Sequence, residues 1–395
     1  MNPVKILIFL RNSDKHLMDI PISDQKELLN RMGPGKNDED RSFKQFRGHH
    51  LMYYWWKEVI VEIGSFFVFP FFLMFCGLKH LADRKTFERV DAAGDFNNFF
   101  EIVPDSLRKE YDINNDHWNK GFFLSLKEIR YLLLLFLKYP IPCFVLKVAI
   151  KMAYYKYVIV KHSPRAIIVH NEASYTSSII TSFCNKNGVM HINVMHGEKL
   201  YYIGDGYFRF NRCYVWSEYY KQLFISMNAE ESQFIIELPL AMKINTEKYF
   251  KQNLYSDFKY YLQNYDENQL LSIIDSLQFI KRIGKTIKFR PHPRGTNLDI
   301  LEKLVPKEQI EYPKEVSIME SIASTSCAIG SFSTVQNQAF YSGKLTIFDD
   351  VTYKQDYQKL KEYGYFFSNM PHNRLSTFVD DTLENYHEIQ MFKNK

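Results

Sequence analysis

RAIIVHNEASYTSSIITSFCNKNGVMHINVM, residues 165–195, contains a strand, a helix and a second strand in succession. The apolar run 166–169 precedes a polar turn and a helical stretch that ends at Lys186. A stop at Asn187-Gly188 then leads into the apolar run 189–195. Two strands joined by a helix lie parallel in one sheet. The stretch therefore predicts an α/β fold with a parallel sheet.

The same alternation continues toward the C-terminus. A further strand at 213–216 is followed by Ser217, which can cap a helix. Beyond a crossover at 225–245, the pattern predicts a long amphipathic stretch at 268–282, strands at 286–290, 309–312, 327–330 and 344–349, and helices at 298–304, 318–323 and 334–341. Strands and helices at this spacing indicate a doubly wound parallel sheet, whose ligands bind beyond the carboxyl ends of the strands.

The chain length of 395 residues suits two domains of ordinary size. We place the boundary between an N-terminal, acceptor-binding, Rossmann-like domain at residues 1–225 and a C-terminal, nucleotide-sugar-binding, Rossmann-like domain at residues 226–395. Two such domains facing each other supply a cleft. The C-terminal helix either stays with its own domain or packs back on the first.

The first 160 residues are unusually aromatic, and the whole chain contains 33 Phe, 27 Tyr and 4 Trp. The apolar run 63–78 is short for a bilayer span of about 20 residues and contains Pro70, while 131–150 is interrupted by lysines and prolines. These segments predict extra aromatic helices, either interfacial or in an ordinary core. Residues 4–10 resemble a strand rather than a signal peptide. We expect a cytoplasmic protein, peripheral on the inner membrane face.

Charge and composition exclude several classes of function. The net charge of +5 is too near balance for nucleic-acid binding, and five scattered cysteines indicate reduced thiols. The sequence contains no P-loop, GxGxxG, GxSxG or HExxH motif. Asp349-Asp350 could bind a metal, although acidic residues at a strand end are more often solvated. We expect no cofactor and no obligatory metal.

The first candidate site is KFRPHPR at residues 288–294, which lies at a predicted strand end. Pro291 and Pro293 fix the backbone around His292, with Arg290 and Arg294 on either side. An imidazole and two guanidinium groups can donate to phosphate oxygens and stabilise the charge on a departing nucleotide. The alternative is a proline-bounded loop with a solvated basic pair.

The second candidate site is GSFSTV at residues 330–335, where another predicted strand leads into a helix. Ser331, Ser333 and Thr334 offer hydroxyl donors, and the start of the helix offers free backbone N–H groups. Such a helix start can bind an anion, although Ser and Thr cap many helices that bind nothing.

Two further groups follow strands of the N-terminal half. His196, Gly197 and Glu198 come after the strand 189–195, and Asn171-Glu172 come after the strand 166–169. His196 or Glu172 could serve as a general base. A plain turn histidine and a glutamate that complements a helix dipole are the alternatives.

Taken in order, these motifs over residues 165–350 resemble bacterial surface-polysaccharide glycosyltransferases of the GT-B fold, especially those that use CMP-activated sialic acid, other nonulosonic acids or Kdo. The elements that carry the resemblance are Asn171-Glu172, His196-Gly197, His292-Pro293 and the serine-rich segment 331–334. The usual Ser-Thr-Val-Gly-x-Glu-Ala pattern is altered, since Gln336 and Gln338 replace its glycine and glutamate.

The resemblance implies how the residues divide between the two substrates. Pro293 and Gln338 join the arginines, His292 and the hydroxyl residues in binding the nucleotide. Asn171, Gly197 and Glu198 bind an oligosaccharide or lipid-linked glycan acceptor, and Glu172 or His196 deprotonates it. The expected reaction is an inverting transfer from a CMP-sugar in capsule or lipopolysaccharide synthesis. The alternatives are a CDP-glycerol-dependent transferase of the teichoic-acid type and a non-catalytic nucleotide-binding scaffold of a polysaccharide assembly complex.

Overall fold

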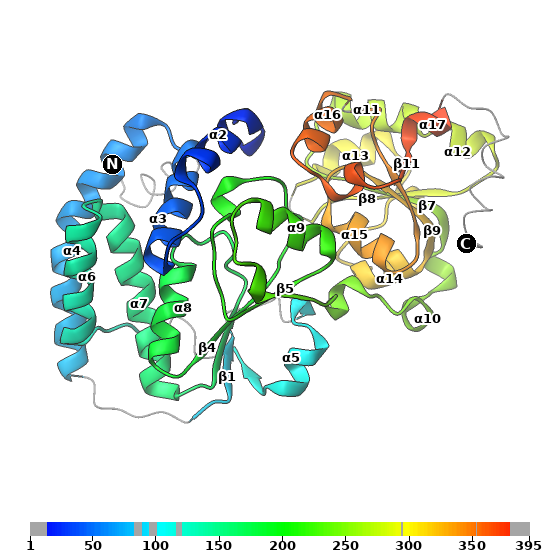
Figure 1. Cartoon of the computed structure of the whole chain (residues 1–395). Helices are drawn as coiled ribbons and strands as arrows, with labels where there is room; N and C mark the ends of the chain where they lie inside the picture. The colour runs from blue at the N-terminus through cyan, green and yellow to red at the C-terminus, as the bar shows by residue number, and fades with distance from the viewer. Residues whose placement is uncertain are drawn as a thin grey trace. The chain divides into compact units, whose positions relative to one another are not determined.

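The computed structural model describes residues 14–82, 89–94, 101–115, 121–293, 295–352 and 354–379, whose course is shown in Figure 1. The chain divides into two compact units. The first runs to His196 and includes Tyr201–Pro239, and the second consists of Gly197–Leu200 and the chain from Leu240 onward. The first unit therefore extends past the predicted boundary at residue 225. The strand expected at 4–10 lies outside the described residues.

The first unit contains a six-stranded parallel sheet in the order β2-β1-β3-β4-β5-β6. Its strands are β1 (Ala92–Gly94), β2 (Ile113–Asn114), β3 (Ala166–Val169), β4 (Met190–Val194), β5 (Arg212–Val215) and β6 (Phe234–Ile236). The predicted strand–helix–strand unit is confirmed, because β3 and β4 pair directly, with Ala166 opposite Met190. The last strand, β6, explains why this unit continues to Pro239.

Helices cover this sheet in layers. They are α2 (Ile22–Met32), α3 (Asp38–His49), α4 (Trp55–Ala82), α5 (Asp105–Glu110), α6 (Leu126–Lys138), α7 (Pro142–His162), α8 (Ser177–Lys186) and α9 (Glu218–Ser226). Helix α8 packs on β4, α7 packs on α8, and α4 packs on α7. In Figure 1, α4 and α6 are accordingly the helices of this group farthest from the strands. The segment 131–150 is divided between α6 and α7, because Pro140 and Pro142 end one helix and begin the next.

The second unit contains a five-stranded parallel sheet in the order β11-β10-β9-β7-β8. Its strands are β7 (Ser256–Tyr261), β8 (Ile287–Arg290), β9 (Thr325–Gly330), β10 (Leu345–Phe348) and β11 (Asn373–Arg374). The fold class is therefore confirmed as two Rossmann-like units, each with a doubly wound parallel sheet.

The helices of the second unit are α10 (Thr246–Tyr249), α11 (Glu267–Ser276), α12 (Gln278–Arg282), α13 (Leu298–Leu304), α14 (Ile318–Ala323), α15 (Thr334–Tyr341), α16 (Lys354–Glu362) and α17 (Leu375–Val379). Three of them, α13, α14 and α15, have the predicted bounds, whereas α10, α16 and α17 were not predicted. Among the described residues, 3-10 helices include η1 (Leu17–Asp19), η2 (His50–Met52), η4 (Ile203–Asp205), η5 (Glu231–Gln233), η6 (Leu240–Met242), η7 (Gln252–Leu254), η8 (Lys307–Gln309) and η9 (Phe366–Asn369). Side-chain caps set several starts, such as the capping box of Ser317 and Glu320 at α14.

The central strand β7 is the main element that the sequence pattern missed. Its sequence, SDFKYY, includes a lysine, which is unusual in a strand that is buried on both faces. The ammonium of Lys259 is fully buried and forms an ion pair with Glu311 at 2.5 Å. This carboxylate and the Ser321 carbonyl, which accepts from the ammonium at 3.0 Å, are both distant in sequence and make the buried charge tolerable, so the strand could not be recognised from local apolar content.

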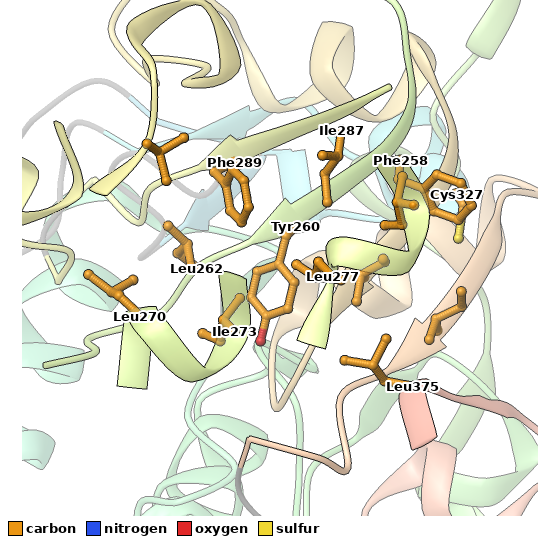
Figure 2. Packing of buried hydrophobic residues seen from close by; sticks show 14 of the residues in the cluster. Phe258, Tyr260, Leu262, Leu270, Ile273, Leu277, Ile287, Phe289, Cys327 and Leu375 are labelled. Carbon is orange, nitrogen blue, oxygen red and sulfur yellow. The ribbon is translucent and has the colours of Figure 1, made fainter. Parts of the chain in front are cut away.

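The core of the second unit lies around β7 and β8. Figure 2 shows Tyr260 and Phe289 from these strands together with Ile273 of α11 and Leu277, which lies between α11 and α12. Leu375 and Phe378 of α17 belong to the same cluster. The last described helix therefore packs on the core of its own unit, and the residues after 379 lie outside the described part of the chain.

Two local predictions differ from the structure. Residues 309–312 do not form a strand, since η8 occupies 307–309 and only an isolated bridge joins Ile310 to Phe289. The amphipathic stretch 268–282 is divided into α11 and α12 at Leu277.

Candidate functional site

In the second unit, three loops meet at the carboxyl end of the sheet. The strand order reverses between β7 and β9, and this is the position where doubly wound sheets bind ligands. The loops that follow β7, β8 and β9 carry Tyr265, His292 and Ser331 respectively. Because β7 lies between β8 and β9, its loop can join the two predicted nucleotide-binding segments.

A series of hydroxyl groups fixes Ser331. Its Oγ lies 2.6 Å from the Tyr265 hydroxyl, and the Tyr260 hydroxyl donates to Asp349 Oδ2 at 2.5 Å. Tyr260 and Tyr265 also interact through a hydrogen bond. Burial raises the pKa of Tyr265 to about 12, so its hydroxyl stays protonated. The series therefore holds Ser331 at the strand end with its hydroxyl in a defined position.

Hydrogen bonds within the second unit occupy the carboxylates of Asp349 and Asp350, the pair that could have bound a metal. Asp349 also accepts hydrogen bonds from the Val351 and Thr352 N–H groups, each at 3.0 Å, and Asp350 accepts one from the Ser376 hydroxyl at 2.7 Å. Within the described part of the chain, no group of three His, Cys, Asp or Glu side chains is placed to hold a metal ion. Asp349 and Asp350 thus organise loops at the end of β10.

His292 is exposed and lies beside the loop that follows β7. The backbone N–H of His292 donates to Thr296 Oγ1 at 2.8 Å, and the Thr296 hydroxyl donates to the Gln263 carbonyl at 2.8 Å. A Cβ atom added to Gly295 would lie 3.2 Å from His292 Nδ1 and 3.3 Å from Asn264 Cβ. The His292 ring and Asn264, which follow β8 and β7 respectively, therefore both lie beside Gly295. Pro293 is exposed, and the predicted contact Arg294 lies outside the described residues.

Arg290, which the sequence predicts to contact the nucleotide, has its guanidinium engaged inside the protein instead. Its guanidinium is buried, donates to Glu311 at 2.8 Å and donates to the Val316 carbonyl at 2.9 Å. Burial alone would raise the pKa of Glu311, but Lys259 and Arg290 outweigh this effect and lower it. Arg290 therefore belongs to a buried ion network behind the site, because the side chain at this strand position points into the protein.

The start of α15 supplies donors for an anion. Ser333 caps the helix by accepting from the Val335 N–H at 3.2 Å, and Thr334 is the first helical residue. Gln336, which is 2% exposed, has no hydrogen-bond partner for its Nε2 atom among the described residues. A Cβ on Gly330 would lie 2.7 Å from that nitrogen. The strand end thus combines a helix N-terminus, a buried amide donor and a glycine that leaves room beside it.

Two predicted site residues, Gln338 on this helix and Glu198 outside it, form hydrogen bonds within the protein. Gln338 donates to the Ala241 carbonyl at 2.8 Å and so ties α15 to η6. Glu198 accepts a hydrogen bond from the Asn337 side chain. Gly197 and Glu198 therefore belong by their contacts to the second unit, not to the N-terminal domain as predicted. Gly197 has a φ of +73°, a conformation that favours glycine.

In the first unit, Glu172 occupies the carboxyl edge of the sheet between β3 and β4. It is 2% exposed, accepts from Asn193 Nδ2 at 3.2 Å and accepts from the His196 N–H at 3.4 Å. The Asn171 N–H donates to Asn193 Oδ1 at 2.7 Å. The predicted proximity of Asn171, Glu172 and His196 is therefore observed, and Asn193 links the groups.

Asn193 was missed by the sequence analysis, although a polar residue inside the apolar strand 189–195 marks it. Two residues of α3, a helix that the sequence analysis did not connect with this site, also support this edge. Gln45 donates to the Glu172 carbonyl at 2.8 Å, and His49 Nε2 lies 2.6 Å from the Ala173 carbonyl. These contacts join segments more than 120 residues apart, so no local pattern could reveal them.

An imidazole pair completes this edge. The rings of His170 and His196 lie 5.2 Å apart between centroids, tilted by 50°. Both residues are partly exposed, whereas Glu172 beside them is buried. This edge therefore presents a carboxylate and two imidazoles, which are groups suited to proton transfer.

Comparison with known proteins gives structural likeness only. No protein family matches the chain, and no curated protein sequence matches it. Among solved structures, the wall teichoic acid polymerase TagF is similar at a TM-score of 0.40 and 11% identity, over 61% of this chain and 68% of that one. The UDP-GlcNAc 2-epimerase of Methanocaldococcus jannaschii, in complex with UDP-GlcNAc and UDP, has a TM-score of 0.43 and 12% identity, over 78% and 93%. A putative UDP-N-acetylglucosamine 2-epimerase from Listeria monocytogenes has a TM-score of 0.43 and 11% identity, over 67% and 79%.

Proposed function

We propose that the protein is a glycosyltransferase of the GT-B type that transfers a nonulosonic acid or Kdo from a CMP-activated donor to a surface-glycan acceptor. The observation that carries this proposal is the cluster of His292, Ser331 and the start of α15 at the switch point of the second sheet. A cluster of hydrogen-bond donors at the end of a parallel sheet suits a nucleotide phosphate. The protein acts on the inner face of the membrane.

In this proposal the second unit binds the donor. The N–H groups at the start of α15, the hydroxyls of Ser331 and Ser333, and His292 donate to the phosphate. The buried amide of Gln336 completes this set beside Gly330. As the anomeric C–O bond to the phosphate breaks, CMP leaves and its negative charge is stabilised by these donors. The proposed reaction needs neither a metal ion nor a cofactor.

The first unit supplies the base. An acceptor hydroxyl loses its proton to Glu172 or His196 while its oxygen forms the new bond to the anomeric carbon, with inversion. Glu172 is buried and its two known donors fix its carboxylate, while His196 is more open to solvent. Asn171 and the imidazole of His170 lie where they can contact the acceptor.

The first test is a thermal-shift measurement with CMP, CDP, UDP and GDP at equal concentration. CMP should stabilise the protein most, because a ligand that binds only the folded state raises the melting temperature. Ser331→Ala and His292→Ala should weaken that shift, whereas the control Ser276→Ala on α11 should keep it. Preferential stabilisation by UDP would contradict the proposal.

The second test is turnover. CMP release with CMP-sugars and a glycan acceptor should exceed release with CDP-glycerol. The reverse preference would favour the glycerophosphotransferase, and CMP binding without turnover on any donor and acceptor would favour the scaffold.

A further inference from the structure

Helix α4 is apolar on the side that faces solvent as well as on the side that faces the protein. Its buried stripe consists of Ser65, Phe69, Leu73 and Cys76. Large apolar side chains remain exposed over the rest of its circumference, namely Trp55, Val59, Ile60, Ile63, Phe66, Phe67, Val68, Phe71, Met74, Phe75 and Leu78. Its segment Trp55–His80 is long and apolar enough to cross a membrane, yet only 22% of its most apolar window is buried. A helix that is apolar around its whole circumference is normally buried against protein or lipid.

Helix α6 extends this apolar surface. The Phe69 and Phe136 rings lie 5.7 Å apart, and a Cβ on Gly77 would lie 3.2 Å from Ile129, so the two helices run antiparallel. The exposed leucines of α6 are Leu126, Leu133, Leu134 and Leu137, with Leu126 83% exposed. A groove of about 300 Å³ between the helices is lined almost entirely by apolar residues. We call the exposed apolar side chains of α4 and α6 the apolar face.

The exposed charged residues on the described parts of α4 and α6 are all basic. Among the described side chains of α4 and α6, the exposed charged residues are Lys79, Lys127, Arg130 and Lys138, of which Lys138 pairs with Glu39 of α3. The acidic residues of the two helices have partners: Glu58, whose side chain is 35% exposed, pairs with His50, Glu62 accepts from Cys143, and the buried Glu128 pairs with Lys156. The exposed rim is therefore basic.

A pocket of about 180 Å³ lies on the opposite side of α6 from the apolar groove. Lys127, Lys156 and Lys186 line it together with Ser182, and Glu128 is the one carboxylate in its lining. Although burial opposes it, the Ser125 hydroxyl and Lys156 lower the pKa of Glu128, so that this carboxylate stays ionised. Three ammonium groups against one carboxylate leave an excess of positive charge, which suits a phosphate group.

We propose that the apolar face is embedded in the surface of a lipid bilayer and that the lysine pocket beside it binds the phosphate of a lipid headgroup. The basic rim complements anionic lipids. A second copy of the chain fits less well, because a two-fold contact through this face would bring the basic rims of two molecules together. Helix α4 lies along the bilayer surface, since its buried stripe and Glu62 hold it to the first unit.

This inference deepens the membrane localisation in the proposed function, yet it does not depend on the transfer reaction. Vesicle binding is measured without donor or acceptor, so a failure here leaves the nucleotide and turnover tests unaffected.

The first experiment is co-sedimentation of the whole chain with vesicles of phosphatidylcholine and phosphatidic acid. The wild type should sediment, and the double variant Phe67→Glu/Phe71→Glu should bind more than about 100-fold more weakly, because two phenyl groups leave the bilayer. Both residues are more than 60% exposed, so their replacement should not unfold the protein. Phe250→Glu in the second unit, 44% exposed, is the matched control and should bind like the wild type. Wild-type protein that stays in the supernatant, or equal losses in both variants, overturns the proposal.

Light scattering without lipid separates the bilayer from a second copy. The proposal expects no self-association that depends on this face. A dimer that the Phe67→Glu/Phe71→Glu variant converts to a monomer would identify the face as a contact between copies and overturn the proposal.

The lysine pocket has its own test. Lys127→Ala/Lys186→Ala should weaken binding to phosphatidic acid vesicles roughly 30-fold, given about 1 kcal/mol for each lysine near a charged membrane. Binding to vesicles in which oleate supplies the same charge should fall much less, and Lys303→Ala on α13 should change neither. If the variant lost equal affinity for both kinds of vesicle, the lysines would act only through their general positive charge and not as a phosphate site. Competition by free inorganic phosphate would show that the pocket takes the soluble ion, and either result overturns the headgroup site.

Discussion

The two sheets of the molecule share one topology but present different chemistry at their carboxyl edges. In each, the first two strands in sequence lie on one side of the order and the later strands extend on the other. The edge of the first sheet carries a buried carboxylate and two imidazoles, Glu172 with His170 and His196. The edge of the second carries hydroxyls and a helix start at Ser331 and Ser333. The sheet topology therefore sets the position of a site at the carboxyl edge, whereas the side chains of the loops there decide whether the site suits proton transfer or anion binding.

The strongest test of this division is Glu172→Gln. If Glu172 is the base, turnover should fall by about 10² to 10⁴-fold, as for other general bases, while CMP still stabilises the protein. His196→Ala is the companion variant, and only one of the two should show the full loss. Steady-state CMP release checks the result. A loss of CMP binding in Glu172→Gln would break the proposed division between the two edges.

The second expected effect is that the two units lose stability at different pH values. Burial lowers the pKa of His49 and of His191 in the first unit to about 3. The folded state then binds fewer protons than the unfolded state, so stability is full above about pH 6.5 and falls as the pH drops toward 3. Each histidine should cost up to roughly 1.4 kcal/mol per pH unit in that window. In the second unit, the lowered pKa of Glu311 gives a stabilisation that is lost only at lower pH, below about 4.5.

Tryptophan fluorescence can follow this difference, because all four tryptophans precede residue 217 and so report on the first unit. Urea unfolding at several pH values should show a falling midpoint below pH 6.5. The slope should become shallower in His191→Gln. A midpoint that does not change between pH 7 and 5 would contradict the buried neutral state of these histidines.

Gly330→Ala tests the anion site of the second edge. The added methyl group should displace the Gln336 amide, which lies 2.7 Å from the Cβ position, and weaken CMP binding roughly tenfold, the equivalent of losing one hydrogen bond of about 1.4 kcal/mol. Titration calorimetry measures this change. Gly64→Ala is the control, because its Cβ would meet no atom within 4 Å. Unchanged CMP affinity in Gly330→Ala would remove the donor phosphate from the start of α15.

The smallest expected effect concerns the hydroxyl series behind Ser331. Tyr260→Phe should lower the free energy of unfolding by about 1 kcal/mol, since Asp349 keeps its other donors from Val351 and Thr352. CMP affinity should fall slightly, because Tyr265 and Ser331 lose part of their orientation. Chemical unfolding and calorimetry check the two effects. A stability loss without any change in CMP affinity would show that the series is structural only.

Several elements were predictable because their information is local. Helices α13, α14 and α15 have the bounds that their apolar spacing and flanking residues predict, and β3 and β4 follow from short apolar runs. The positions of Glu172, His196, His292 and Ser331 after strands were also predictable, since a parallel sheet places every strand end at one edge.

The sequence by itself therefore determined the fold class, the bounds of α13, α14 and α15 and the edge at which each candidate residue after a strand lies. Tertiary structure alone decided the rest. The pair of Lys259 and Glu311 made β7 a central strand and drew Arg290 away from the site. Asn193 linked Glu172 to its neighbours, and the packing of α4 on α7 left an apolar helix exposed. The physical reason is that buried charges, hydrogen bonds and exposed faces depend on residues far apart in the chain, whereas helix and strand periodicity depends on near neighbours.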